Sequence, residues 1–211
     1  MRVVSGALAV CVLLALAAVF MPSLEARIDG VTFGRRGTMS LYKASTERAL
    51  ARRLFASYAR SKGRRYGEAL ATALLPRVKS RLHAVVDDIG SAMSTLDEVT
   101  DDDVRTGGTV LVIAIWAFLG LELLLGGVVL GESLRDDPRR GRLIAAIAIA
   151  LIAAAIAIAL HLVCREAAWE ANDELGTEVV ALGIGAYVLP VASLGGLVAA
   201  IVLLVQRLRR R

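Results

Sequence analysis

Histidine and cysteine, which carry much of the nucleophilic and metal chemistry of proteins, are scarce in this sequence, with two of each in 211 residues. Cys11 lies in the middle of one apolar run and Cys164 follows the end of another. At about 1.5 Å of helix rise per residue, their expected depths differ by roughly 15 Å. A disulfide needs Cα atoms within about 7 Å of each other, so we predict no intrachain disulfide.

Motifs of common soluble enzymes are missing as well. The sequence has no P-loop, no GxSxG, no HExxH and no CxxC. Four metal-ligating side chains gather near the end of one apolar run, namely His161, Cys164, Glu166 and Glu170. A transition metal would suit such a set, but no second cluster completes a site, and we interpret His161 as an interfacial anchor. We predict no catalytic residue, no metal, no cofactor and a non-enzymatic protein.

Long apolar runs dominate what is present, and hydrophobic residues make up 56% of the chain. Val110–Leu130 is apolar except for Glu122, and a membrane-spanning helix needs about 20 such residues. Three further runs match it, namely Val3–Met21, Leu143–Val163 and Val179–Val205. We predict an integral membrane protein, mainly α. Its parts are a four-helix transmembrane bundle and a small, mostly helical extracytoplasmic domain between the first two spans.

The runs divide the chain into spans and connections. In order, these are transmembrane helix 3–21, extracytoplasmic domain 22–106, transmembrane helix 107–131, basic cytoplasmic loop 132–142, transmembrane helix 143–163, acidic outer loop 164–178, transmembrane helix 179–205 and basic cytoplasmic tail 206–211. The first run resembles a signal peptide, whose apolar core is usually about 7–15 residues long. Because this run is longer, we favour an uncleaved signal anchor over a cleaved peptide.

Arginines in the short flanks set the expected orientation. Gly131–Arg142 contains four and the tail after Val205 four more, whereas Cys164–Glu178 contains one arginine and five acidic residues. Short loops rich in basic residues stay in the cytoplasm, and loops beyond about 60 residues carry little weight. We expect both termini in the cytoplasm, 22–106 outside, and a plasma or inner membrane as the location.

The outer segment opens with alternating apolar and polar residues. Ala26–Gly34 and Thr38–Tyr42 flank the turn signal Gly34-Arg-Arg-Gly37, so a short β-hairpin is the candidate opening element. Ser45–Ser61 has helical periodicity. The capping signal Thr100-Asp-Asp-Asp103 predicts that the second spanning helix begins near Asp101.

Charge is segregated within this segment, because Arg27–Arg81 has a net charge of +11 and Leu82–Thr106 of −6. The basic outer patch comprises Arg52, Arg53, Arg64, Arg65, Arg77, Lys79 and Arg81. It suits anionic lipid or an acidic partner, or else it is a solvated face that pairs with the acidic end of its own domain. We expect no nucleic acid on this side of the membrane.

Glu122 is the intramembrane polar residue. A carboxylate at this depth costs at least about 2.5 kcal/mol on insertion scales, so it is expected to face protein or water. Gly126, one turn away, leaves room for a partner group. The side chain is either a hydrogen-bonded link between helices or a proton or cation relay, and both interpretations stay open.

Small residues recur at four-residue spacing in the later spans. They let helix backbones approach closely, within a bundle or between subunits. The predicted helix-packing positions are Gly127, Gly131, Ala146, Ala150, Ala154, Ala181, Gly185, Ala192 and Gly196.

The layout resembles that of claudin-like tetraspan proteins, with a short inner N-terminus, a large first outer loop that starts with β-structure, a small second outer loop and a basic tail. The W…GLW…C…C signature of that family is missing, and only Gly37 and Leu41-Tyr42 echo it. The resemblance therefore implies topology alone.

Three functions follow as hypotheses. The first is a tetraspan accessory, scaffold or assembly subunit in the lipid bilayer, bound to other membrane subunits or to itself. The second is a channel or proton-coupled transporter that uses Glu122. The third is a sensor whose outer domain binds a ligand.

Overall fold

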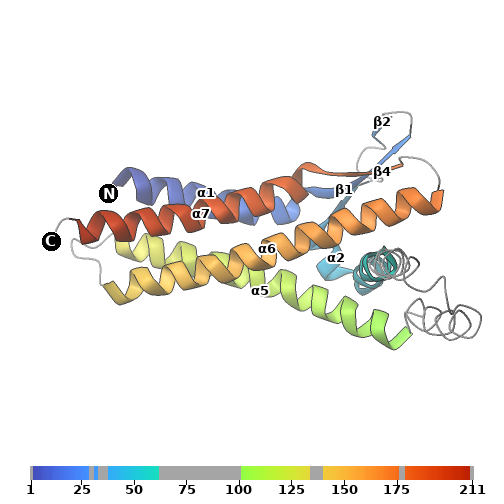
Figure 1. The fold of residues 1–211 in the computed structure, drawn as a ribbon, viewed down its shortest axis with the longest axis horizontal. Helices are drawn as coiled ribbons and strands as arrows, with labels where there is room; N and C mark the ends of the chain where they lie inside the picture. Colours follow the sequence, from blue (N-terminus) through green and yellow to red (C-terminus); the bar gives the residue numbers. More distant parts are fainter. Residues whose placement is uncertain are drawn as a thin grey trace, which may run out of the picture.

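The structure, a computed structural model, describes residues 2–28, 31–32, 38–61, 101–133, 140–175 and 179–209. Long helices run side by side through these residues, and both chain ends lie at the same end of the bundle (Figure 1). The long helices are α1 (Arg2–Phe20), α5 (Asp101–Ser133), α6 (Arg140–Leu175) and α7 (Ile184–Leu208). A small β-sheet lies at the opposite end of the bundle, which we call the sheet end.

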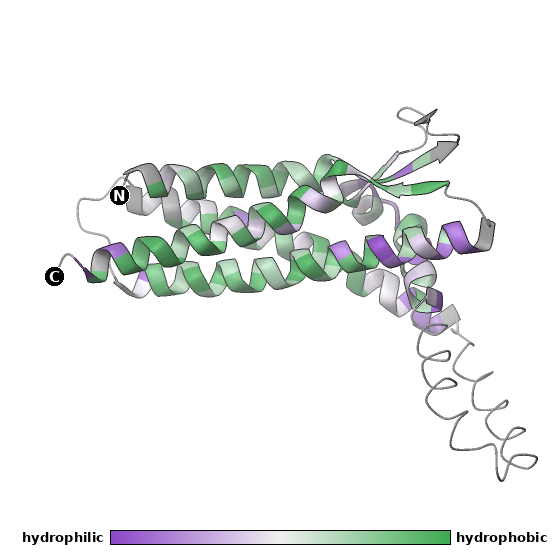
Figure 2. Cartoon of the chain, turned by 45° about the horizontal axis from the view of Figure 1, so that its top comes forward, coloured by the Kyte–Doolittle hydropathy of each residue, from purple (hydrophilic) through white to green (hydrophobic). Residues whose placement is uncertain are grey.

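The surface of the bundle is apolar. Among the described residues, three helices are long and apolar enough to cross a membrane, and α1 contributes a shorter apolar stretch, Val4–Phe20. Large side chains such as Leu13, Ile113, Leu123 and Val191 point outward. Figure 2 shows hydrophobic colour along most of each long helix, with hydrophilic colour gathered toward the sheet end. Soluble proteins rarely expose such a continuous apolar surface. The chain is a membrane-embedded, mainly α protein.

Small residues allow the helices to pack closely. α1 packs against α7 and α5, and α6 packs against the same two helices. Near the sheet end the core includes Phe118, Ala157 and Leu189, and near the chain termini it includes Leu8 and Ala150. Because dispersion contacts rather than water exclusion hold helices together in lipid, close approach at such alanines is the main source of packing energy.

The sheet joins segments that are far apart in sequence. Strand β1 (Pro22–Ile28) follows α1 after one residue and pairs antiparallel with each of the other strands. These are β2 (Val31–Thr32), β3 (Thr38–Ser40) and β4 (Val180–Leu182). Since β4 leads directly into α7, the sheet fixes the ends of α1 and α7 to each other.

Two predicted elements take a different form. β3 pairs with β1 and not with a strand over 26–34, and the turn at Gly34–Gly37 lies outside the described residues. The prediction that Ala181 packs within a helix is wrong. Ala181 lies in β4, opposite Glu25 of β1, and the helix begins only at Ile184. Backbone pairing with β1 competes with helix formation at this point.

The third apolar helix is longer than its apolar run. α6 continues to Leu175, so most of the predicted acidic loop 164–178 is helical. The predicted helix Ser45–Ser61 is divided, because α2 (Leu41–Thr46) ends at its C-cap Glu47 and a second helix covers 48–61. Both helices lie against the bundle at the sheet end (Figure 1).

Candidate functional site

Glu122 lies inside the bundle. Its side chain on α5 is 1% exposed, and the Ser193 hydroxyl on α7 donates a hydrogen bond of 3.1 Å to Glu122 Oε1. The carboxyl group therefore faces protein and not lipid, and it joins α5 to α7. Ser193 is a partner that sequence reasoning missed, because a serine in an apolar helix has no signal beyond its polarity.

α1 closes the other side of this site. A Cβ atom on Gly126 would lie 3.3 Å from Val12 Cγ1, and one on Gly195 would lie 3.1 Å from Cys11 Sγ. The room expected beside Gly126 is thus occupied by α1. No basic side chain among the described residues pairs with Glu122. A carboxyl group and one hydroxyl, enclosed by three helices, form a short interhelical link.

A second polar contact crosses the helices nearer the sheet end. Pro190 in α7 has no N–H, so the carbonyl of Ala186, four residues earlier, lacks its helical donor. His161 of α6 lies with Nδ1 at 2.8 Å from that carbonyl oxygen. Since a carbonyl only accepts, Nδ1 is the donor. His161 thus supplies the hydrogen bond that Pro190 removes.

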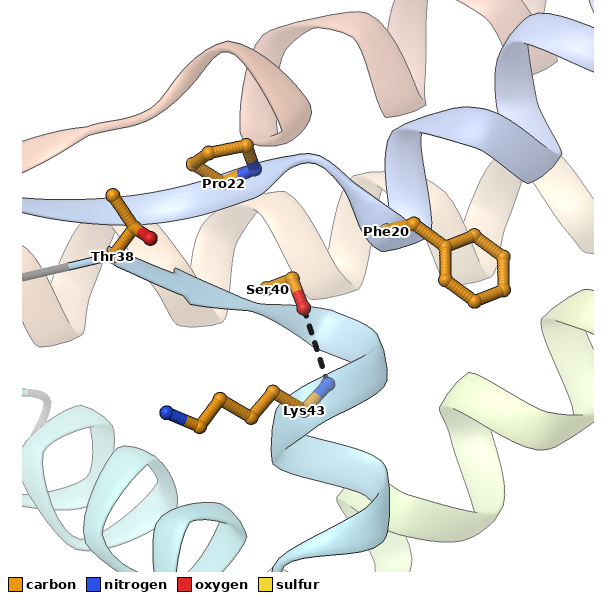
Figure 3. A pocket seen from close by; sticks show the side chains of 5 residues that line it. All are labelled: Phe20, Pro22, Thr38, Ser40 and Lys43. Carbon is orange, nitrogen blue, oxygen red and sulfur yellow. Dashed lines mark hydrogen bonds between the residues drawn. The ribbon is translucent and has the colours of Figure 1, made fainter. Parts of the chain in front are cut away.

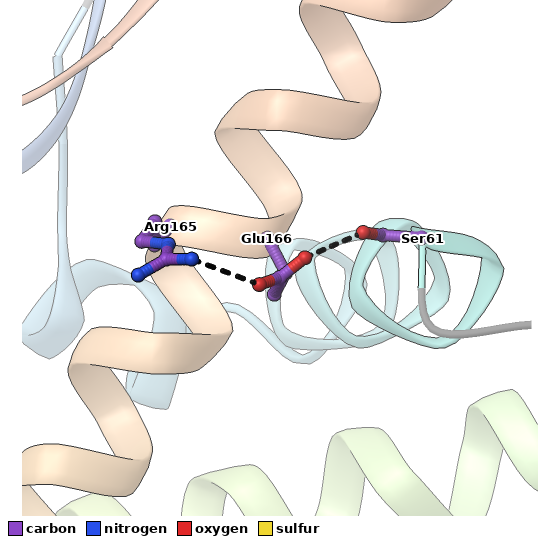
Figure 4. A network of polar contacts seen from close by, with 3 residues as sticks. All are labelled: Ser61, Arg165 and Glu166. Carbon is purple, nitrogen blue, oxygen red and sulfur yellow. Dashed lines mark hydrogen bonds and ion pairs between the residues drawn. The ribbon is translucent and has the colours of Figure 1, made fainter. Parts of the chain in front are cut away.

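The acidic end of α6 holds the helix over 48–61. The Ser61 hydroxyl donates a 2.7 Å hydrogen bond to Glu166 Oε2, and Arg165 Nη2 lies 3.9 Å from Glu166 Oε1 (Figure 4). Ser61 is 0% and Glu166 3% exposed. Glu170, one turn further along α6, is also buried, and Cys164 lies in the apolar core. Glu166 therefore anchors a helix.

Asn172 positions β4. Its Oδ1 accepts from the backbone N–H groups of Val179 and Val180 at 2.9 and 2.7 Å, and its Nδ2 donates to the Val180 carbonyl at 2.8 Å. One side chain thus satisfies three backbone groups, one on Val179 just before β4 and two on Val180 at the start of the strand. From the sequence, Asn172 belongs to the predicted acidic outer loop 164–178, with no predicted role.

The predicted packing residues divide into two groups. Ala146, Ala150, Ala154, Ala192, Gly185 and Gly196 are buried between helices. Gly127 is exposed, and no described atom lies within 4 Å of a Cβ built on Gly127 or Gly131. These two glycines of α5 lie on the outside of the bundle.

The predicted basic patch is described only in part. Arg52 and Arg53 are exposed on the helix over 48–61, and the other five residues lie outside the described residues. This helix approaches α5 closely, because a Cβ on Gly108 would lie 3.0 Å from Arg52 Cα and one on Gly107 would clash with the Phe55 ring.

A crevice of about 220 Å³ opens beside the end of α1, and Phe20, Pro22, Thr38, Ser40 and Lys43 line it. Figure 3 shows the Phe20 ring on the side of α1 and the Lys43 side chain extending away from it. Ser40 Oγ accepts from the Lys43 backbone N–H at 3.2 Å. The crevice thus has one apolar end and one cationic end.

No family model, curated protein or solved structure matches the chain.

Proposed function

We propose that the chain is a non-enzymatic, four-span membrane scaffold, an accessory or assembly subunit of a larger membrane complex. The observation that carries the proposal is the position of Glu122. The one carboxyl group of the α5 apolar run is buried and bonded to Ser193 of the same chain. Such a bond supports a structural role, since polar side chains commonly join helices in lipid.

The proposal takes α1 as a fourth span. Val4–Phe20 has 17 residues, so as a helix it is about 26 Å long, slightly shorter than a typical hydrocarbon core of about 30 Å. α1 lies antiparallel to α7, with both chain ends together. The arginines of the 132–142 loop and of the tail favour the cytoplasm for that end. The sheet end then lies outside.

The outer face of α5 is the proposed contact with a partner. Gly120 and Gly127 are exposed, and no described atom lies within 4 Å of a Cβ at either position. They are seven residues apart, which is about two turns, so they share a face. A second helix is able to approach the α5 backbone closely there.

Co-purification tests this assembly role. We expect tagged full-length chain, extracted from native membranes in mild detergent, to retain a stoichiometric partner or a second copy of itself. Gly127→Leu is expected to lower recovery about tenfold, because one added side chain at a close interface costs about 1–3 kcal/mol. Gly6→Leu, on the exposed face of α1, is the matched control. A lone monomer with no stoichiometric partner would contradict the proposal.

A channel or proton-coupled transporter is the second candidate function. Two polar contacts along α7 favour it. Ser193 is hydrogen-bonded to Glu122, and the Ala186 carbonyl, which has no helical donor because of Pro190, is hydrogen-bonded to His161. These groups lie at successive levels between Glu122 and the sheet end. A proton relay would use such a series.

Substitutions at Glu122 separate the two candidates. In the scaffold, Glu122→Gln is expected to keep the Ser193 hydrogen bond and unfold within about 0.5 kcal/mol of the parent, whereas Glu122→Leu loses about 0.6–1.7 kcal/mol. Ser193→Ala, alone and combined with Glu122→Leu, completes a double-mutant cycle in thermal unfolding. No coupling between the two positions would contradict a structural bond.

Flux in proteoliposomes gives the other half of this test. A transporter that depends on Glu122 is expected to lose flux in Glu122→Gln while its stability is unchanged. Absence of proton or cation flux in the parent protein would remove the transport candidate.

A further inference from the structure

Three aromatic rings meet at the sheet end of the bundle. The Phe20 and Tyr42 ring centroids lie 4.8 Å apart, and those of Tyr42 and Trp116 lie 6.5 Å apart. The rings come from α1, α2 and α5, and they are 57%, 39% and 51% exposed. Tyr and Trp gather where hydrocarbon meets headgroups, because each has an apolar body and a polar tip. An exposed aromatic cluster of this kind is typical of a membrane boundary.

The crevice lies directly beside the aromatic cluster, since Phe20 belongs to both. Its volume of about 220 Å³ is below the roughly 300–1,000 Å³ of sites that enclose drug-sized molecules. It therefore accommodates a small polar group, with any attached chains left outside on the bundle surface. The nearest such surface is the aromatic cluster.

The polar groups of the crevice favour an anion with oxygen acceptors. Lys43 supplies an ammonium group, and no carboxylate among the described residues forms an ion pair with it. Ser40 Oγ accepts from the Lys43 N–H, which leaves its own O–H to donate. Charge-assisted hydrogen bonds from lysine and hydroxyl groups are typical of phosphate recognition.

We propose that this crevice binds the phosphate headgroup of an anionic phospholipid, whose acyl chains lie along Phe20, Tyr42 and Trp116. The ammonium of Lys43 meets the phosphate at the headgroup level, and the rings meet the upper part of the chains. The site goes beyond the proposed scaffold function and rests on it only in placing the sheet end at a membrane surface. Arg52 and Arg53, the two residues of the basic patch that the structure describes, do not line the crevice.

Tryptophan quenching by brominated lipid tests the site. The chain has two tryptophans, so Trp169→Phe leaves Trp116 as the only emitter. In mixed detergent micelles, phosphatidylglycerol with brominated acyl chains is expected to quench Trp116 saturably. Phosphatidylcholine with the same chains is expected to quench it only in proportion to its content in the micelle. Equal quenching by the two lipids would overturn the proposal.

Charge variants locate the headgroup. Lys43→Gln is expected to weaken phosphatidylglycerol binding about tenfold, the scale of one lost charge-assisted hydrogen bond. Lys43→Arg is expected to retain most of it. Arg48→Gln removes the same charge from an exposed position outside the crevice and is the matched control. Equal losses in Lys43→Gln and Arg48→Gln would reduce the effect to general surface charge and overturn the site.

Two further arms keep the outcome clear. Competition by inorganic phosphate separates a lipid site from a site for a soluble phosphate compound, and complete displacement of the brominated lipid would overturn the lipid assignment. Unfolding temperatures of Lys43→Gln and Arg48→Gln without lipid are expected to match, which excludes misfolding. Because the isolated chain is used, loss of partner recovery in the co-purification experiment does not affect this test.

Discussion

A Gly185→Val variant is expected to lose about 3 kcal/mol of stability or more, through overpacking against atoms that are unable to move away. A Cβ on Gly185 would lie 2.8 Å from the carbonyl oxygens of Ala18 and Met21, and 2.9 Å from that of Pro22. All three belong to the backbone at the junction of α1 and β1. The added side chain would push α7 away from that junction. Thermal unfolding in mild detergent, followed by size-exclusion chromatography, measures the loss.

Gly6→Val is the matched control for this prediction. No described atom lies within 4 Å of a Cβ on Gly6, which is exposed on α1 and lies outside the proposed partner face of α5. The control is expected to unfold within about 1 kcal/mol of the parent, because it changes helix propensity only. Equal stability of the Gly185→Val and Gly6→Val variants would contradict the close approach of α7 to β1.

His161→Leu is expected to cost about 1–3 kcal/mol, the penalty of a buried carbonyl left without a donor. His161 Nδ1 is the group at 2.8 Å from the Ala186 oxygen, and Ala186 is 1% exposed. In lipid no water replaces the lost donor. Thermal unfolding of the purified variant in mild detergent measures this cost.

Pro190→Ala is expected to rescue the His161→Leu variant. Alanine at 190 restores a backbone N–H four residues after Ala186, so the helix itself then satisfies the carbonyl. Most of the lost stability should return in the double variant, while Pro190→Ala alone changes the parent little because His161 already occupies the acceptor. If Pro190→Ala changes stability equally in the parent and in the His161→Leu variant, then the His161 imidazole is not the donor that replaces the missing N–H.

The sequence predicted the positions of the membrane helices better than the residues at which those helices begin and end. The apolar runs locate α1, α5, α6 and α7, because hydropathy reports which residues tolerate hydrocarbon. It does not report where a helix stops, so α6 passes Val163 and continues to Leu175. Nor does it separate strand from helix, since Ala181 belongs to an apolar run yet pairs with Glu25 of β1. That pairing depends on a residue far away in sequence.

At the candidate sites, too, the sequence predicted which residue is buried but not which residues contact it. The high cost of a carboxyl group in lipid predicts that Glu122 faces protein or water, and the structure buries it in protein. Its partner Ser193 depends on how α5 and α7 rotate about their axes, which local sequence does not specify. Lys43 was absent from the predicted basic patch, because its significance comes from Phe20 and Ser40 across the crevice.

The position of β4 beside β1 sets an order of events during synthesis. Residues 29–179 separate the two strands, so at about 5–20 residues per second the ribosome needs roughly 8 to 30 seconds to deliver the second strand after the first. Throughout that interval one edge of β1 has no backbone partner from β4, and such edges invite pairing with other chains. The sheet therefore closes only after α1, α5 and α6 have been made, and a chain that stops before Val180 keeps that edge of β1 without its β4 partner.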